Sequence, residues 1–534
     1  MKLLITSLMA IFILVCKSQT IFQRTYDIGS GTEITKKIIN VSGGYVMAGY
    51  SSSSSLQKDI LIIQTNSTGN VVWSKTYSGV KDDEATDIIS TYDGGFAVTG
   101  LTKSFATTGT DSVNAFIMKL DAVGNIIWSK AFGGNAHDAG NAILQTSDSG
   151  FVVTGYTESF GGGNKDVLII KTNKNGNTTW MKAFGGSNPD VGNSICKSAS
   201  NNYFLTGSTG ITGSQNIILS LYINPSGNLI WHKTYDFTLS ASNFQRIGFG
   251  ALENNNKQFL ITGKVGSGTF GDAQAFLLNI DSTGNSVNWA RAYVLNSGDC
   301  SARSIQSLPD GGYVLGGSMG NYSPALIKVN SSGLRQWSYY YGSMNVPAIQ
   351  GFGYSVAKAG DKGFALSGYY LPGSTNDTSA VIIKTDSLGN SSCNFANTFG
   401  SGTNTLTAIV SQISSTLTSG GTSFNISPSV ISPVISPNTL CLTVGIGSTS
   451  KENPFIDIYP NPFNANTVIR FNEYLEDVEI NLYDLLGKKL RTIGNISGNE
   501  YELSSEGLDA GVYFLILKHN NNSISKIKLV VSNY

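Results

Sequence analysis

The stretch Asp93–Gly100, "DGGFAVTG", decides the fold, because near-copies of it recur along the chain. "SGGYVMAG", "DSGFVVTG", "DGGYVLGG" and "DKGFALSG" each combine a tight turn, a short apolar run and a final glycine. Glycine supplies the positive φ that a hairpin turn needs, and runs rich in Val, Phe and Tyr favour strands. The stretch therefore predicts a β-hairpin that is repeated along the chain.

The tryptophans follow the same repeat of about fifty residues, in copies such as "STGNVVWSKTY" and "AVGNIIWSKAF". They are Trp73, Trp128, Trp180, Trp231, Trp289 and Trp337, and a seventh copy, "SLGNSSC", has Cys393 instead. Each copy contains four short strands with period-two alternation, as in "ATDIIST", "GFAVTGL", "NAFIMKL" and "NIIWSKAF". This pattern predicts an all-β fold, a seven-bladed β-propeller over residues 19–400, with the tryptophans packed between neighbouring blades.

The start of this region, "IFQRTYDIGSG", aligns with "WSKTYSGV" and therefore corresponds to a fourth strand without its first three. We expect Ile21 to Asp27 to complete the seventh blade from the other end of the chain. A strand edge that would otherwise stay unpaired is then covered.

Residues 1–18 have the pattern of a secretory signal peptide, with Lys2 before the apolar run Leu3–Val15 and small residues before Gln19. A lipoprotein signal acylated at Cys16 is the alternative, and Val15 stands where that signal needs a small residue. No later stretch is long and apolar enough for a membrane helix. The 35 basic residues balance 35 acidic ones, so no net field attracts nucleic acid.

The rhythm changes after residue 400. Residues 401–452 are rich in Ser, Thr and Pro and predict a linker or an extended segment packed on the propeller. Cys393 and Cys441 bracket this segment, and the sequence leaves open whether they form a disulfide. Residues 453–534 contain about seven short strands, which predict a small Ig-like β-sandwich.

Two resemblances follow from these motifs. The repeat resembles bacterial propellers with tryptophan-docking or delta-60-like repeats, and "LDAVGNIIWSK" also resembles the repeat of quinoprotein dehydrogenases. The motifs "YPNPF", "LYDLLGK", "GVYFLIL" and "SKIKLVV" resemble the type A sorting domain of the type IX secretion system in Bacteroidetes. The residues that carry this second resemblance are Pro460, Asn461, Pro462, Gly487, Lys488, Gly511 and Tyr513.

The sorting resemblance implies Sec export, passage through the type IX translocon and removal of the domain by a sortase-like protease. The product would be secreted or attached to surface lipopolysaccharide at the outer cell surface. A generic adhesive sandwich is the alternative reading of residues 453–534.

No residue set predicts a catalytic centre, a metal site or a bound cofactor. Ser318 in "GGSMG" resembles a nucleophile elbow, but no helix follows it, and the chain has only three histidines. Acidic residues recur before the first strand of several repeats, as Glu33, Asp83, Asp138 and Asp190, with Asp299 offset by one. They could hold a cation at the channel mouth or cap backbone N–H groups of the loops.

The sequence favours a binding module for a glycan or a protein. The alternatives are a polysaccharide-active or quinone-dependent enzyme and a structural envelope component. The tight turns lie on one side of the predicted ring, so the long irregular loops share the other side, where binding residues usually lie. The predicted binding residues are Phe244, Tyr354, Tyr369 and Tyr370, with Asp83, Asp138 and Asp190 as further candidates.

Overall fold

The computed structural model consists of strands joined by turns and loops, and no described residue is helical. It describes residues 19–29, 31–52, 57–105, 112–211, 215–237, 244–267, 273–294, 299–319, 323–341, 350–371, 377–391, 396–398, 402–433, 435–439, 456–484, 488–519 and 522–532. The expected signal peptide, and Cys393 and Cys441, for which the sequence leaves a disulfide open, lie outside these ranges. No helix that could cross a membrane is found in the described part of the chain. The chain divides into two compact units, Met1–Thr443 and Val444–Tyr534.

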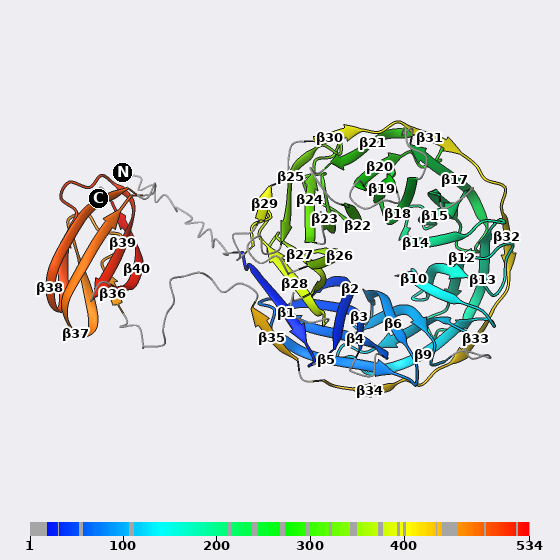
Figure 1. Cartoon of the computed structure of the whole chain (residues 1–534), viewed down its shortest axis with the longest axis horizontal. Helices are drawn as coiled ribbons and strands as arrows, with labels where there is room; N and C mark the ends of the chain where they lie inside the picture. The colour runs from blue at the N-terminus through cyan, green and yellow to red at the C-terminus, as the bar shows by residue number, and fades with distance from the viewer. Residues whose placement is uncertain are drawn as a thin grey trace, which may run out of the picture. The chain divides into compact units, whose positions relative to one another are not determined.

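The first unit is built from sets of four antiparallel strands. The first three sets are β2 (Thr32–Val41), β3 (Gly44–Ser52), β4 (Lys58–Asn66) and β5 (Val71–Ser78); β6 (Asp83–Ser90), β7 (Phe96–Thr102), β8 (Asn114–Leu120) and β9 (Ile126–Gly133); β10 (Asp138–Gln145), β11 (Phe151–Thr157), β12 (Asp166–Thr172) and β13 (Thr178–Gly185). The next three are β14 (Asp190–Lys197), β15 (Tyr203–Gly210), β16 (Asn216–Ile223) and β17 (Leu229–Phe237); β18 (Phe244–Glu253), β19 (Phe259–Ser267), β20 (Gln274–Ile280) and β21 (Val287–Val294); β22 (Ser301–Ser307), β23 (Tyr313–Met319), β24 (Ser323–Val329) and β25 (Arg335–Tyr341). Figure 1 shows the sets following one another around a ring, with the first strand of each set nearest the centre.

The last set combines both ends of this unit. Strands β26 (Gln350–Lys358), β27 (Phe364–Leu371) and β28 (Ser379–Thr385) are joined by β1 (Phe22–Asp27), which pairs antiparallel with β28. The strand pairing expected for residues 21–27 is therefore confirmed. It satisfies the backbone edge of β28 that the missing fourth strand would leave open.

The Ser/Thr/Pro-rich segment is not a free linker over residues 402–439. It forms β30 (Gly402–Thr405), β31 (Ala408–Ser411), β32 (Thr416–Ser419), β33 (Thr422–Asn425), β34 (Ser429–Ile431) and β35 (Ser436–Thr439), preceded by β29 (Ala396–Thr398). We call β29–β35 the belt. Its strands pair in turn with β25, β21, β17, β13, β9, β5 and β1, the last strand of every set, and Figure 1 shows them around the outside of the ring. The belt covers edges that would otherwise expose unpaired N–H and C=O groups.

Each tryptophan lies against a turn of the following set, as the sequence predicts. A Cβ added to Gly176 would lie 2.5 Å from the Trp128 ring, and one added to Gly227 would lie 2.9 Å from the Trp180 ring. Phe22 of β1 contacts Gly69 in the same way and so replaces the tryptophan that the last repeat lacks. The indoles are half-buried rather than fully buried.

The core of the first unit lies between neighbouring sets. One cluster, for example, joins Val46 and Ile62 of the first set to Val98 and Phe116 of the second. Because both faces of these strands are covered, their central residues are apolar without strict alternation.

The described part of the second unit contains five strands, whereas the sequence predicts about seven. They are β36 (Ile456–Tyr459), β37 (Asn466–Tyr483), β38 (Lys489–Ser504), β39 (Gly511–His519) and β40 (Asn522–Val531). The number is smaller because β37 and β38 are long and bend at register shifts where the sequence suggested strand ends. Their inner faces share a core that includes Ile469, Val478 and Leu515.

The sorting-motif residues hold the turns of this unit. The Asn461 side chain accepts a hydrogen bond from Val530 N (2.8 Å), Pro460 O accepts one from the Thr467 hydroxyl (2.6 Å), and the Tyr513 hydroxyl donates to Asp509 O (2.7 Å). Lys488 N donates to the Asp484 carboxylate at 2.9 Å, Gly511 begins β39, and Gly487 lies outside the described residues.

Candidate functional site

The first strand of every set contains a β-bulge at the same position. The register against the second strand shifts there, and the extra residues are Lys36, Thr86, Asn141, Asn193, Phe249, Arg303 and Tyr354. A bulge redirects one side chain away from the regular alternation of the strand. The repeat therefore presents one redirected residue from each set.

These seven residues line one pocket, which we call the central pocket. Its volume is about 640 Å³, and its lining comes from β2, β6, β10, β14, β18, β22 and β26, the first strands of all the sets. A pocket of this size suits a small ligand. The scaffold repeats around the pocket, whereas the residues that it presents differ.

Three of the bulge residues have a structural role. The Thr86 hydroxyl donates to Gly140 O at 2.6 Å, and Nδ2 of Asn141 donates to Gly192 O at 2.9 Å. Nδ2 of Asn193 donates in the same way to Gly248 O at 2.9 Å. Each bond joins one first strand to the next, so these three side chains connect neighbouring sets.

Lys36 belongs to a charged group at the first two sets. Its Nζ lies 2.7 Å from Glu84 Oε2, and Nζ of Lys58 lies 2.5 Å from Glu84 Oε1. Burial raises the pKa of the Glu84 carboxyl, but the two lysines outweigh burial and lower that pKa below its ordinary value. Both ammonium groups also lie over the Tyr50 ring, at 5.5 and 4.5 Å from its centroid.

The remaining three bulge residues form a stack of different character. The Arg303 guanidinium lies 4.7 Å from the centroid of the Phe249 ring and 5.1 Å from that of the Tyr354 ring. Phe249 has no polar side-chain group, so it cannot form the hydrogen bond to the next first strand that Thr86, Asn141 and Asn193 form. Among the described residues Arg303 has no carboxylate partner, and its Nε is buried without a hydrogen bond. Burial lowers the pKa of Arg303, yet a guanidinium stays charged at physiological pH.

Two of the four predicted aromatic residues belong to this stack. The rings of Tyr354 and Tyr369 lie 6.2 Å apart, with Phe352 stacked on Tyr369 at 5.9 Å. Tyr370 does not join them, because it is buried in the core and its hydroxyl donates to Tyr341 O. Phe244 begins β18, and its side chain is outside the described part of the structure. The long loops predicted to bind are also largely outside it.

The predicted acidic residues Asp83, Asp138 and Asp190 bond to their own loops. Asp83 accepts hydrogen bonds from the Thr102 and Ser104 hydroxyls, and Asp138 accepts them from Gly134 N and the Ser159 hydroxyl. Asp190 accepts one from Gly186 N. Burial raises the pKa of all three, that of Asp190 to about 6. In the described ranges no group of three His, Cys, Asp or Glu side chains is placed to hold a metal ion.

Sequence reasoning missed Arg303, Phe249 and Lys36 as pocket residues. A signal was present, because a small residue precedes the bulge in most repeats and the next residue varies as Thr, Asn, Asn, Phe, Arg and Tyr. Variation at one fixed position of a repeat marks a presented side chain.

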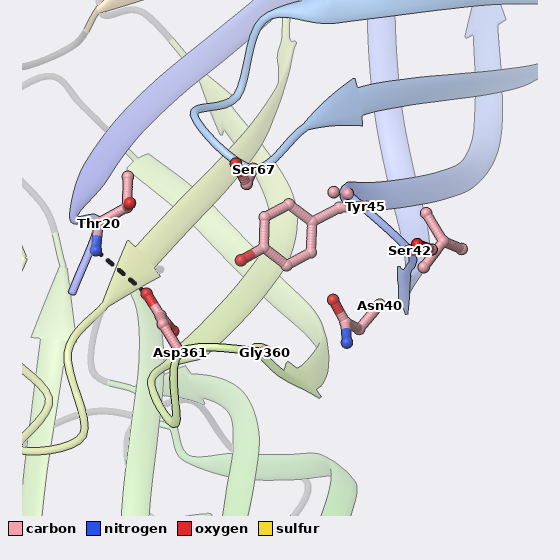
Figure 2. Close-up of a pocket in the computed structure, with 10 residues that line it drawn as sticks. Thr20, Asn40, Ser42, Tyr45, Ser67, Gly360 and Asp361 are labelled. Atoms are coloured by element: carbon pink, nitrogen blue, oxygen red, sulfur yellow. Dashed lines mark hydrogen bonds between the residues drawn. The ribbon is translucent and has the colours of Figure 1, made fainter. Parts of the chain in front are cut away.

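A second pocket of about 560 Å³ lies in the first unit, where Thr20 meets the turns around Ser42 and Asp361 (Figure 2). The Tyr45 ring lies along it, and Asp361 accepts a hydrogen bond from Thr20 N at 3.1 Å. Lys384 already pairs with Asp361 at 2.8 Å, so the carboxylate has its counterion. The hydrogen bond from Thr20 holds the chain just before β1 against the last set. The charged group of this pocket is therefore already neutralised, unlike Arg303 in the central pocket.

Residues 457–532 match the family described as "Secretion system C-terminal sorting domain". This match shows export by the type IX secretion system to the cell surface or the extracellular space. No curated protein matches the sequence. A solved chain described as the extracellular domain of a hybrid two component system from B. thetaiotaomicron aligns at 10% identity and a TM-score of 0.16, covering 94% of this chain and 98% of that one. An alignment at that score carries no argument about fold or function.

Proposed function

We propose that the protein is a secreted or surface-displayed binding protein whose first unit is a seven-bladed β-propeller. The repeated four-strand sets, the pairing of β1 with β28 and the belt on every outer strand support this architecture. The ligand is a glycan or a protein. It binds in the central pocket, and the long loops do not form the whole binding site.

The stack of Phe249, Arg303 and Tyr354 carries this proposal. A structural role accounts for Thr86, Asn141 and Asn193, which tie neighbouring sets together, but not for a cation held between two aromatic rings. Arg303 is half-buried with its Nε fully buried, and partial burial of a guanidinium without a carboxylate costs stability. That cost is understandable where a ligand supplies the partner.

A ligand screen with pocket variants tests the proposal. Purified protein is applied to glycan and extracellular-protein arrays, and the hits are compared with Tyr354→Ala and with Tyr92→Ala, a control at an exposed turn tyrosine. We expect Tyr354→Ala to weaken binding at least tenfold and the control to leave it unchanged. Hits that depend on Tyr92 and ignore Tyr354 would contradict the central pocket as the site.

We also propose that a sortase-like protease removes the sorting domain after export. The division between Thr443 and Val444 supports this, because each unit has its own core. Intact mass measurement of the exported protein should give a chain that ends before Ile456, and a full-length exported chain would contradict removal.

A further inference from the structure

We infer that the central pocket binds an acidic sugar and that Arg303 receives the carboxylate of that sugar. This inference rests on the proposed function and names the ligand class of the same pocket.

The charge around the pocket is the first argument. Lys36 and Lys58 share a single carboxylate, that of Glu84. Arg303 lines the pocket two sets away from Lys36, with the set of β26 between them, and its charge, after burial, helps to lower the pKa of Lys264. The whole chain has a formal net charge of +0, so a surplus of cations here is a local feature. It favours an anionic ligand.

The geometry of Arg303 narrows the anion to one with two coplanar oxygens. Phe249 and Tyr354 come from β18 and β26, the strands on either side of β22, and they cover the guanidinium from both neighbours. The N–H donors of a guanidinium lie in its own plane. A carboxylate matches this fork with two parallel hydrogen bonds, whose strength rises in a partly dry pocket.

A sugar fits the rest of the lining better than an acidic peptide. Flat rings suit stacking on a pyranose, and the side-chain amide of Gln306, which also lines the pocket, suits its hydroxyls. Peptides often bind extracellular β proteins by adding a strand to a sheet edge. In this unit the belt already pairs with the last strand of every set, so those edges are occupied.

Paired ligands that differ only in charge test the inference. Short uronic-acid oligosaccharides, such as oligogalacturonates, glucuronate-containing and alginate-derived oligomers, are each titrated calorimetrically into the full-length protein beside their methyl esters. We expect at least one acid to bind about 10- to 100-fold more tightly than its ester, and Arg303→Met to remove that preference. Arg291→Met is the matched control, because Arg291 also lies over an aromatic ring, at 5.8 Å from Trp289, but on β21.

The outcomes separate the two proposals. If the esters or neutral sugars bind as tightly as the acids, and Tyr354→Ala weakens all of them, the pocket is a binding site but the acidic-sugar inference is wrong. If acids bind and Arg303→Met leaves their affinity unchanged, the inference is wrong. If no acid in the panel binds while an acidic peptide does, the ligand class is wrong. If ligands bind without any response to Tyr354→Ala, the pocket itself is overturned.

Discussion

Two features of the structure favour glycine in the "GN" turns: a positive φ and a close contact with a tryptophan ring. Gly176 has a φ of +75° and would place a Cβ 2.5 Å from the Trp128 ring. Gly94, in the other type of turn, has a similar φ of +82° but nothing within 4 Å of a Cβ. The two positions therefore separate backbone strain from contact with the tryptophan.

We expect Gly94→Ala to cost about 1 kcal/mol of unfolding free energy, from the left-handed backbone alone. Gly176→Ala should cost about 2–4 kcal/mol, because the indole must also move. Denaturant unfolding of both variants measures the difference. Equal losses would show that tryptophan docking adds nothing to stability.

Glu33 gives the stability a pH dependence. Only 2% of this side chain is exposed, its Oε2 has no hydrogen-bond partner, and burial, reinforced by Asp27 and Asp377, raises its pKa from 4.5 to about 8. The folded state thus favours the protonated carboxyl. This contribution is fully present below pH 4.5 and is lost as the pH rises towards 8, by up to about 1.4 kcal/mol per pKa unit.

Glu33→Gln should flatten the fall in melting temperature between pH 5 and pH 8. Scanning calorimetry at several pH values measures it, with Glu253→Gln as a control that keeps the wild-type slope. An unchanged slope in Glu33→Gln would show that Glu33 is ionised in the folded protein.

The residues that the sequence could predict are those with a repeated structural task. Trp128 and Gly176 recur at fixed spacing, so their contact follows from the repeat itself. Arg303 occurs once at its position, and only three-dimensional structure brings it beside Phe249 and Tyr354, which are about fifty residues away on either side. The burial of Tyr370 could not be predicted, because a strand's alternation does not reveal which face meets the neighbouring set.

At the scale of elements, the belt changes which deletion should matter. A linker, or a segment only packed on the ring, over residues 401–452 would matter less for stability than the strand that closes the last set. Yet the belt pairs with seven last strands, whereas β1 pairs with β28 and β35 only. Its side chains also enter the core, as Ile426 and Ile435 do.

Deletion of 402–439 should therefore lower the melting temperature and cause self-association, because it exposes strand edges. Differential scanning fluorimetry and size-exclusion chromatography measure both effects, and a synthetic peptide of residues 402–439 should reverse them in part. A deletion variant that stays monomeric with the wild-type melting temperature would contradict an edge-covering role.

The belt could not be recognised in the sequence for a physical reason. Its strands are three or four residues long, with mostly exposed or half-exposed side chains. So few positions cannot show a hydrophobic period. These strands are held by backbone hydrogen bonds, which any residue except proline can donate and accept, so their amino-acid composition does not reveal them. The strands of the four-strand sets, by contrast, are seven to ten residues long in most cases and bury apolar runs that recur with the repeat, so the sequence predicts them.

At the scale of the whole molecule, two units have separate tasks. The ring of sets carries the central pocket, and residues 457–532 carry the export signal. The export signal was predictable because its turn motifs are local, such as the Tyr513 hydroxyl bonded to Asp509 O four residues away. The central pocket was not predictable, since its lining comes from the first strands of all seven sets.

Deletion of residues 453–534 should abolish export while leaving the first unit folded. Unit two buries Ile469, Val478 and Leu515 in a core of its own, so its loss removes no core residue from the ring of sets. In a host with a type IX secretion system, we expect the truncated chain to accumulate in the periplasm, with at least a tenfold lower amount outside the cell. Immunoblots of fractionated cells measure the location, and protease resistance of the periplasmic chain controls for misfolding.

Conversely, residues 444–534 fused to a periplasmic carrier protein should send that carrier outside. Normal amounts of truncated, protease-resistant protein in the medium would show that export depends on another part of the chain.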